Sequence, residues 1–235
     1  MNIGILTICT GSYNVFFEGL YSSLEKNFLK DHNKTYYVFT DSYIENHENV
    51  INITQEKLGW PFDTMMRFHM FNKIKETLLK EEFLFFFNVN MKALTEINDE
   101  VLPNENNDFL MGALHPGFYN SPINTFPYDR NPECSCCIPF NKGSKYYQGC
   151  FNGGSSIEFM KMSEILADNI DKDIKNNITP IWHDESQLNW YYKDKNILTL
   201  PYSYIYPESW VHLPLSKIMI QRDKSKYGGH EFLRK

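Results

Sequence analysis

Short apolar runs alternate with amphipathic stretches in the first half of the chain. Residues 3–9 form an apolar run that predicts a buried strand, and large apolar residues then recur every four positions from Phe16 to Phe28, which predicts an amphipathic helix. Residues 64–80 carry an apolar stripe that predicts one long helix, capped by Asp63 or Thr64. Further apolar runs are typical of strands, at residues 36–39, 50–53 and 83–87.

This order of elements predicts an α/β fold. Strands that alternate with helices favour a mostly parallel, Rossmann-like central sheet with helices on both faces. Ligands of such sheets bind at the carboxyl ends of the strands. Three predicted strands end in polar residues, which are therefore candidates for a binding site: Thr10-Gly11, Thr40-Asp41 and Asn88-Val89-Asn90.

The second half of the chain is less regular. Ser155 and Glu158 fit a capping box that opens a helix to about Asp171, and residues 182–186 begin another helix. No repeat or linker divides the sequence, so residues 1–235 are expected to form a single domain. The other expected elements are a strand at 109–114, a long loop excursion over 119–148, a tight turn at Phe151-Asn152-Gly153-Gly154 and a strand near 218–220.

Composition and charge disfavour some classes of protein. The chain has 235 residues, of which 42% are hydrophobic, enough for one sizeable core. Its net charge of −6 argues against a nucleic-acid partner, because phosphate contacts require clustered cations. The segment from Lys217 to Lys235 is the exception, since it carries six cationic residues against two acidic ones. This basic tail is either a solvated end or a segment that closes over a diphosphate.

The cysteines and the apolar runs bear on the compartment. Three of the five cysteines crowd into Cys134-Ser135-Cys136-Cys137 without a second pair, so no structural zinc site is expected and free thiols are the default. The sequence begins without a signal-peptide pattern, and its longest apolar run, residues 83–87, is far below the roughly 20 residues of a membrane span. We therefore expect a cytoplasmic domain without an integral membrane span, with peripheral contact at a membrane left open.

Asn88 and Asn90 point the same way from the end of a predicted strand, because side chains alternate along a strand. Amides at this place either satisfy loose backbone groups or hydrogen-bond phosphate and sugar hydroxyls together. Two aspartates there would chelate a divalent cation that bridges a diphosphate, whereas neutral amides are poor sole ligands for Mg²⁺ or Mn²⁺. The pair therefore fits a polar ligand better than a metal ion.

A second polar cluster, Trp182-His183-Asp184-Glu185-Ser186, stands at a predicted helix start. Acidic residues are ordinary in a first helical turn, since they complement the helix dipole. A carboxylate held near an anomeric carbon is also able to attack it or to stabilise an oxocarbenium-like state. The residues alone leave both interpretations open, as they do for two further segments that are either turns or ligand contacts, His115-Pro116-Gly117 and Gln148-Gly149-Cys150.

Several motifs, in order along nearly the whole chain, resemble glycosyltransferase family 6, which includes the histo-blood-group ABO transferases, α-1,3-galactosyltransferase and bacterial homologues. The last motif, 182–186, is the most specific, and the others are 37–41, Gly59-Trp60 through Met65-Met66-Arg67, 87–90, 115–119 and Tyr146-Tyr147 through Gly153-Gly154. The resemblance implies a GT-A fold. It also implies retaining transfer of galactose or N-acetylgalactosamine from a UDP-sugar, with an α-1,3 bond to a galactose-terminated, fucosylated acceptor.

The resemblance further implies roles for single residues. It places donor binding mainly in residues 1–115, and acceptor binding and catalysis mainly in residues 116–235. Asp184 matches a donor-sugar ligand, Glu185 matches the proposed nucleophile, and both are expected to be catalytic. The other donor residues are Ile8, Thr10 and Tyr13 at the strand end that holds uridine, Arg67 near the donor sugar, and Gln148, Gly149 and Cys150 in the segment that selects this sugar. The acceptor candidates are His115, Trp182 and Glu208.

One departure from the family pattern concerns the metal. Asn88 and Asn90 take the place of the metal-binding aspartates, an exchange known from bacterial members, which implies that no metal ion or other cofactor is needed. Other positive charges must then offset the leaving diphosphate, and the candidates are Arg222, Lys224 and Lys226. Animal members are anchored in Golgi membranes, and the lack of an anchor pattern here favours a bacterial enzyme.

The donor and the activity leave alternatives. Cys150 is larger than the glycine typical of transferases that use N-acetylgalactosamine, so the sequence favours UDP-galactose over UDP-N-acetylgalactosamine. A carbohydrate-binding protein of the same fold without catalysis is one alternative, and an enzyme that inverts or hydrolyses the same donor is another. The retained carboxylates Asp184 and Glu185 argue against the first.

Overall fold

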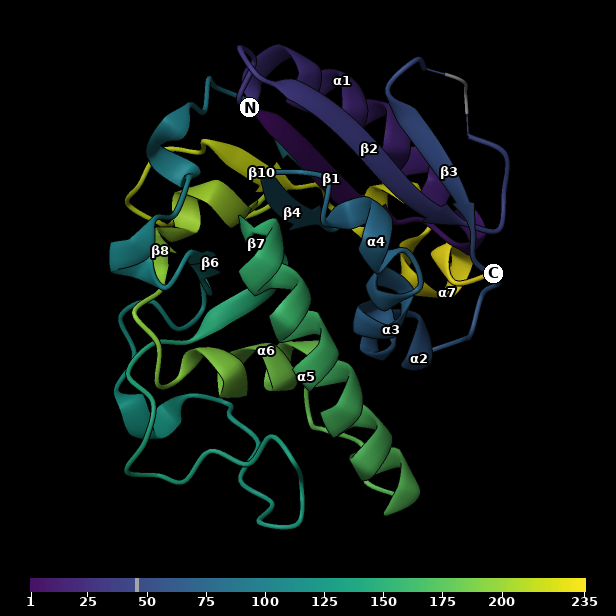
Figure 1. Ribbon diagram of the computed structural model, residues 1–235. Coiled ribbons are helices and arrows are strands. Elements are labelled where there is room, and N and C mark those ends of the chain that lie inside the picture. Colours follow the sequence, from purple (N-terminus) through teal and green to yellow (C-terminus); the bar gives the residue numbers. More distant parts are fainter. Residues whose placement is uncertain (45–46) are drawn as a thin grey trace.

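The computed structural model describes residues 1–44 and 47–235 as a mixed α/β fold (Figure 1). Within these residues, a large sheet has the strand order β3-β2-β1-β4-β7-β6-β8, and a small sheet has the order β5-β10-β9. The strands are β1 (Asn2–Ile8), β2 (Asn33–Thr40), β3 (Val50–Thr54), β4 (Phe83–Phe87), β5 (Met91–Ala93), β6 (Leu110–Leu114), β7 (Tyr147–Ser155), β8 (Leu198–Leu200), β9 (Tyr206–Pro207) and β10 (Met219–Gln221). The helices are α1 (Phe17–Asn27), α2 (Phe62–Met65), α3 (Arg67–Asn72), α4 (Lys75–Leu78), α5 (Ser156–Lys175), α6 (Asp184–Tyr192) and α7 (Gly229–Leu233).

The mostly parallel sheet is confirmed, with one reversed strand. β1 pairs in parallel with β2 and β4, whereas β7 is antiparallel to both of its neighbours, β4 and β6. Phe87, the last residue of β4, lies opposite Phe151 in β7. The amino-terminal end of β7 therefore lies at the same edge of the sheet as the carboxyl end of β4. This arrangement brings residues 148–150 beside residues 88–90, and the amide of Asn88 donates to the carbonyl oxygen of Cys150 at 2.8 Å.

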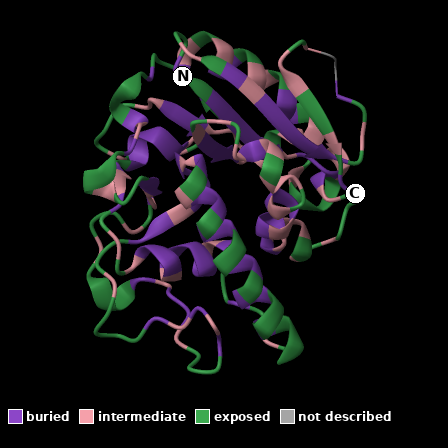
Figure 2. Ribbon diagram, viewed as in Figure 1, coloured by how far each residue is buried: buried purple, intermediate pink, exposed green. Residues whose placement is uncertain are grey.

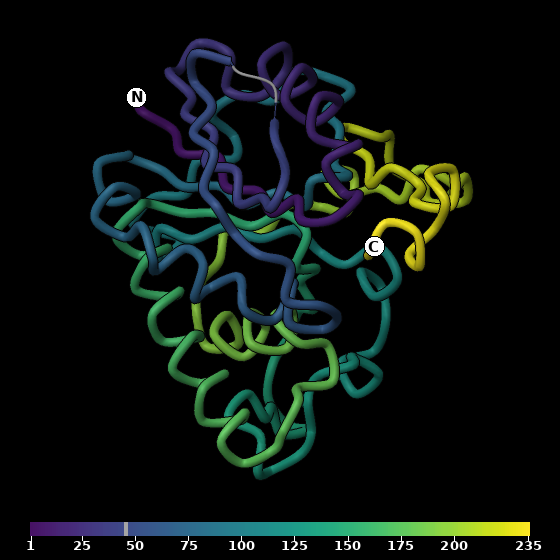
Figure 3. Tube along the Cα trace, turned by 90° about the vertical axis from the view of Figure 1, so that its right-hand side faces the viewer, coloured from purple at the N-terminus to yellow at the C-terminus, as the bar shows by residue number. Residues whose placement is uncertain are grey.

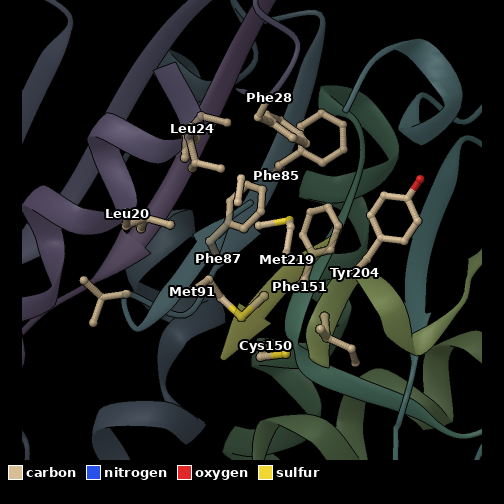
Figure 4. Packing of buried hydrophobic residues seen from close by; sticks show 14 of the residues in the cluster. Leu20, Leu24, Phe28, Phe85, Phe87, Met91, Cys150, Phe151, Tyr204 and Met219 are labelled. Atoms are coloured by element: carbon tan, nitrogen blue, oxygen red, sulfur yellow. The ribbon is translucent and has the colours of Figure 1, made fainter. Parts of the chain in front are cut away.

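Helices cover both faces of the large sheet, which explains why β4 is apolar throughout. Phe85 and Phe87 pack on one face with Leu20 and Leu24 of α1, as Figure 4 shows. The alternate residues of β4 pack on the other face, in a cluster that includes apolar side chains of α3, α5 and α6. Figure 2 shows the strands as largely buried and one side of α5 as exposed, as expected for a helix that covers a sheet.

The predicted long helix over residues 64–80 is wrong, because the chain there forms the three short helices α2, α3 and α4. Met66 and Ile74, which separate them, have ψ angles of 9° and 24° rather than the roughly −42° of an α-helix. Neither Asp63 nor Thr64 caps the segment, since Pro61 stands at the N-cap and the Asp63 carboxylate accepts from the Leu58 amide instead. The breaks allow side chains that lie off the predicted stripe to be buried, including Met65 and Phe68.

The predicted tight turn at residues 151–154 is also wrong, since these residues lie inside β7. Their glycines serve close packing rather than chain reversal. A Cβ atom on Gly153 would lie 2.4 Å from Cδ1 of Phe85, and one on Gly154 would lie 2.5 Å from the carbonyl oxygen of Phe109. The helix start that follows is confirmed, because the Ser155 hydroxyl accepts from the Glu158 amide at the start of α5.

The basic tail folds back onto the start of the chain. It forms a 3₁₀ turn at Lys224–Tyr227 and then α7, which packs against the turn that follows β1 (Figure 3). Gly11 in that turn has a φ of +60°, and a Cβ atom there would lie 3.3 Å from the carbonyl oxygen of Leu233. The Lys57 ammonium donates to the carbonyl oxygens of Arg234 and Lys235 at 3.0 and 2.8 Å. The tail thus lies at the carboxyl end of β1.

Within residues 1–44 and 47–235, no helix combines the length and the apolar character that crossing a bilayer requires.

Candidate active site

A pocket opens at the carboxyl edge of the large sheet, where parallel sheets bind ligands. Its walls come from the ends of β1 and β4, the start of β7, the start of α6 and the basic tail. Most of the residues selected from the sequence line it: Ile8, Thr10, Tyr13, Arg67, Asn88, Asn90, Gln148, Gly149, Cys150, Trp182, Asp184, Glu185 and Lys224. The sequence did not indicate a ligand-binding role for the other lining residues: Lys57, Trp60, Asp63, Thr64, Phe86, Val89, His183, His230 and Arg234.

Glu185 is held by two hydrogen bonds in the pocket wall. Its Oε1 accepts from the Tyr146 hydroxyl at 2.7 Å, and its Oε2 accepts from the Gly149 amide at 2.8 Å. Burial raises the pKa of Glu185 to about 7, although these two hydrogen bonds favour the charged form and oppose the rise. A carboxyl group that titrates near neutral pH in a pocket is typical of a catalytic group.

Asp184 forms a buried ion pair with Arg67. The Nη2 atom of Arg67 lies 2.9 Å from Oδ2 of Asp184, and its Nη1 donates to the carbonyl oxygen of Gly149 at 2.7 Å. The guanidinium also lies over the Phe86 ring, 4.5 Å from its centroid. Burial raises the pKa of Asp184, and the positive charge of Arg67 opposes this rise. The pair fixes the direction of both side chains at the pocket floor.

Gly149 makes room for this ion pair. A Cβ atom on Gly149 would lie 3.1 Å from Oδ2 of Asp184 and 3.2 Å from Nη2 of Arg67. A methyl group at this position would be in tight contact with the ion pair, which would have to shift by a few tenths of an ångström. The glycine therefore leaves the Arg67–Asp184 pair undisturbed beside the amide that bonds Glu185.

His183 adopts a strained backbone conformation directly before α6, with φ of +55° and ψ of −120°. Residues other than glycine rarely adopt positive φ, at a cost of about 1–3 kcal/mol, and such residues gather at functional sites. The His183 ring lies 4.8 Å from that of Trp60, and the guanidinium of Arg234 lies 3.9 Å from the centroid of the Trp60 ring. The strain thus occurs beside a packed group of Trp60, His183 and Arg234 that lines the pocket.

The two asparagines differ in their surroundings. The Asn90 side-chain amide donates to the carbonyl oxygen of Arg222 at 3.0 Å, and the Arg222 amide donates back to the carbonyl oxygen of Asn90 at 2.8 Å. Asn90 therefore ties the end of β4 to the basic tail. The Asn88 side chain has no hydrogen-bond partner within the described part of the chain, and it lines the pocket. Asn88 is thus free to contact a ligand.

Of the three cations selected from the tail, Lys224 alone lines the pocket. Its ammonium lies 5.2 Å from the centroid of the Tyr13 ring, and burial, together with the charge of Arg234, lowers its pKa. Arg222 instead packs its guanidinium against the rings of Phe16 and Tyr227, each with its centroid 4.9 Å away. Lys226 forms an ion pair at 2.9 Å with Glu208. The structure places Arg222, Lys226 and Glu208 outside the pocket lining.

His115 also lies outside the pocket lining, where it contacts Glu185 only through Tyr146. Its Nδ1 accepts from the Gly117 amide at 3.0 Å, and its ring lies 5.7 Å from that of Tyr146, which bonds Glu185. Burial lowers the pKa of His115 to about 4, so the ring is neutral at neutral pH. Asp41, at the end of β2, accepts from the Gly11 amide and braces a strand end rather than facing the pocket.

The comparisons with known proteins agree with one another. The sequence model of glycosyltransferase family 6 matches residues 1–226. O-antigen biosynthesis glycosyltransferase WbnI of Escherichia coli is 38% identical over 229 residues, which cover 96% of this chain and 96% of WbnI. Histo-blood group ABO system transferase 2 of Rattus norvegicus is 30% identical over 213 residues, 85% of this chain and 62% of that protein. Globoside alpha-1,3-N-acetylgalactosaminyltransferase 1 of Gallus gallus is 28% identical over 200 residues, 80% of this chain and 57% of that protein.

Proposed function

This chain belongs to glycosyltransferase family 6, and on that premise we propose that it transfers galactose from UDP-galactose to a galactose-terminated, fucosylated glycan. The transfer retains the anomeric configuration, forms an α-1,3 linkage and uses no metal ion. The observation that carries the proposal is the position of Glu185. Its carboxyl group is held by Tyr146 and Gly149 in the same pocket as Asn88 and Lys224.

The reaction breaks the bond between the anomeric carbon and the diphosphate and forms a bond from that carbon to the acceptor's 3-hydroxyl oxygen. The proton of that hydroxyl passes to the departing diphosphate. Positive charge develops on the sugar as the diphosphate leaves. An ionised Glu185 supports this step, whether it attacks the carbon or stabilises the oxocarbenium-like state. Arg67 holds the carboxylate of Asp184 in an ion pair, and this carboxylate binds hydroxyls of the donor sugar.

The leaving diphosphate needs positive charge that Asn88 and Asn90 do not supply. Lys224 supports metal-free transfer, since it reaches the pocket and is half-buried, so that its charge acts through a medium less polar than water. Arg234 and Lys57 add two further cations to the same lining. The Asn88 amide, which lines the same pocket, hydrogen-bonds the phosphate oxygens without contributing net charge.

The choice of galactose is supported by Cys150. This residue is only 2% exposed and packs in the core cluster where that cluster meets the pocket, so its side chain has little room to move aside. A fixed side chain at the place where the family selects the donor sugar leaves less room for an N-acetyl group than a glycine would. The expected preference is therefore for UDP-galactose.

The experiment is a donor and acceptor panel in excess EDTA, with UDP-galactose and UDP-N-acetylgalactosamine offered to fucosylated and unfucosylated galactosides. We expect full turnover with EDTA, and an α-anomeric product proton by NMR. Activity that chelation abolishes and Mn²⁺ or Mg²⁺ restores would overturn the metal-free mechanism. A β-anomeric product would overturn retention, and donor binding without turnover would favour the non-catalytic binding protein.

The role of Glu185 is tested by Glu185→Gln, which keeps the side-chain volume and removes the charge. Turnover should fall at least about 100-fold, as is common when a catalytic carboxylate is lost. The matched control is Glu164→Gln on the outer side of α5, where Glu164 only pairs with Lys75. Equal turnover in both variants would exclude Glu185 as the catalytic carboxylate.

A further inference from the structure

A buried group of metal-binding side chains lies outside the pocket lining, in the loop excursion that precedes β7. The Sγ atoms of Cys134 and Cys136 are 3.2 Å apart. Each of these thiols and the carboxylate of Asp129 offer one ligand atom, and the three atoms lie within 4.8 Å of one another. The exposed fractions of these residues are only 4%, 0% and 6%, respectively. A second carboxylate is adjacent, because Oδ2 of Asp173 lies 3.6 Å from the Cys134 sulfur.

The two carboxylates bury negative charge without a positive partner. Among the ion pairs within the described part of the chain, neither Asp129 nor Asp173 has a Lys, Arg or His partner. Arg130, next in sequence, is engaged elsewhere, since its guanidinium lies over the rings of Tyr128 and Phe140. A buried charge without a counter-charge is costly, even when neutral groups hydrogen-bond it.

Neutral donors hold both carboxylates in place. The oxygens of Asp129 accept from the amides of Asn131 and Ile181, at 2.9 and 3.0 Å. Asp173 accepts from the Ser135 amide and hydroxyl and from Gln187, but it stands in the last turn of α5, where the helix dipole disfavours a negative charge. The site is therefore built and rigid, and it lacks only positive charge.

We propose that Cys134, Cys136 and Asp129 bind a divalent cation of the zinc class, with Asp173 as the nearest further oxygen donor. Thiolate ligands select zinc over magnesium or calcium, and structural zinc takes four ligands in a tetrahedron. Zinc–sulfur bonds of about 2.3 Å would place the two sulfurs roughly 3.7 Å apart, so each needs to move by only a few tenths of an ångström. Binding converts both thiols to thiolates and releases two protons. The sequence argued against zinc for lack of a second cysteine pair, and the fold supplies carboxylates instead.

The ion would be structural, since its ligands join the excursion loop to α5 and α6. Asp129 bonds the Ile181 amide just before α6, and Asp173 bonds Gln187 within α6. The same helix begins with Asp184 and continues with Glu185. Metal binding here would stiffen the support of the pocket carboxylates without entering the pocket. The proposal does not rest on the transferase reaction.

The test uses the full chain, stripped with a chelator and then titrated with Co²⁺ as a spectroscopic probe for zinc. One equivalent should produce thiolate-to-cobalt charge-transfer absorption and a tetrahedral d–d spectrum, and Zn²⁺ should displace it. Cys134→Ser and Cys136→Ser should each abolish the absorption. Cys137→Ser is the matched control. The Cys137 thiol is next in sequence to Cys136 but does not belong to the group, so this variant should keep full absorption.

Thermal melting gives a readout that does not depend on activity. Zn²⁺ should raise the Tm of the wild type and of Cys137→Ser, but not that of the two ligand variants. Absence of cobalt absorption at equimolar metal in the folded wild type would overturn the proposal, as would equal loss in Cys137→Ser. A count of three instead of five thiols in the unfolded, metal-free protein would also overturn it, because it would show a Cys134–Cys136 disulfide. A Tm that rises with Zn²⁺ but not with Mg²⁺ or Mn²⁺ distinguishes this site from a catalytic metal site.

Discussion

The carboxyl group of Glu185 titrates in a range set by burial and by two hydrogen bonds. Burial favours the neutral acid and raises its pKa to about 7, whereas the Tyr146 hydroxyl and the Gly149 amide donate to the ionised form and oppose the rise. If the ionised form supports transfer, activity rises as pH increases through about 7. The pH dependence of turnover is therefore a direct readout of these contacts.

Tyr146→Phe removes one of the two donors and keeps the ring. The pKa of Glu185 should rise further, so the acidic limb of kcat/KM should move up by about one pH unit, as expected for loss of a hydrogen bond to a charged group. A pH profile of kcat/KM for wild type and variant checks this. Tyr147→Phe is the control, since the Tyr147 hydroxyl meets Thr199 on the other side of the strand. An unshifted limb in Tyr146→Phe would show that Tyr146 does not tune Glu185.

Lys224 is the tail lysine whose charge can reach a diphosphate, and Lys226 is already paired with Glu208. Lys224→Met keeps an apolar stem over Tyr13 and removes the charge. Turnover with UDP-galactose should fall by about 100-fold, as when one donor to developing charge is lost. Steady-state kinetics of Lys224→Met and Lys226→Met make the comparison, and a larger loss in Lys226→Met would contradict the assignment.

Many of the single residues that line the pocket could be predicted from the sequence, and the others could not for a physical reason. Asn88 and Thr10 could be selected because they follow buried strands, and the carboxyl ends of parallel strands share one edge. Arg234 and His230 reach the same pocket from the tail. Nothing in a basic tail's composition determines which of its cations folds inward, since that depends on how α7 packs against the turn after β1.

Elements with strong local signals were predictable, and those shaped by neighbours were not. β4 and α1 stand where their apolar patterns place them. The predicted helix over residues 64–80 breaks, and the breaks allow Met65, Phe68 and Met70 all to be buried. On one straight helix these three side chains would point over more than half of the circumference. Part of β7 was not predicted as a strand because its glycines locally indicate a turn. In the structure, Gly153 and Gly154 instead allow close contact with Phe85 and Phe109 across the sheet.

Substitution of two glycines in β7 by alanine should affect different properties, stability at Gly153 and turnover at Gly149. Gly153→Ala places a Cβ atom 2.4 Å from Phe85 and 2.7 Å from the carbonyl oxygen of Leu84, so it should lower the free energy of unfolding by about 1–3 kcal/mol. Gly149→Ala places a Cβ atom 3.1 Å from Asp184 and 3.2 Å from Arg67, contacts that a shift of a few tenths of an ångström relieves. It should therefore cost less stability than Gly153→Ala but disturb the Arg67–Asp184 pair and reduce turnover. Urea denaturation and initial rates separate the two effects. Equal stability losses would refute this division of roles along the strand.

The pocket lining combines charged groups from distant parts of the chain. The carboxylates Asp184 and Glu185 come from α6, held by the excursion loop and β7, whereas the cations other than Arg67 come from the tail and from Lys57. On the proposed function, the cations bind the diphosphate of the donor and the carboxylates act at its anomeric carbon. We therefore expect the tail to contribute more to donor binding than to the stability of the sheet.

Removal of the tail after Tyr227 tests this separation. The deleted segment buries one large apolar side chain, Leu233, but contributes His230 and Arg234 to the pocket. We expect the Tm to fall by roughly 3–12 °C with the chain still folded, since one buried leucine stabilises by about 1.5–3 kcal/mol. The Kd for UDP-galactose should rise at least about tenfold, and its dependence on salt should weaken because cations are lost. Isothermal titration at two salt concentrations measures both.

Lys57→Met, which removes the ammonium that holds the Arg234 and Lys235 carbonyls, should raise the Kd for UDP-galactose by a smaller factor than the truncation does. Unchanged donor binding in the truncated protein would place the diphosphate away from the tail.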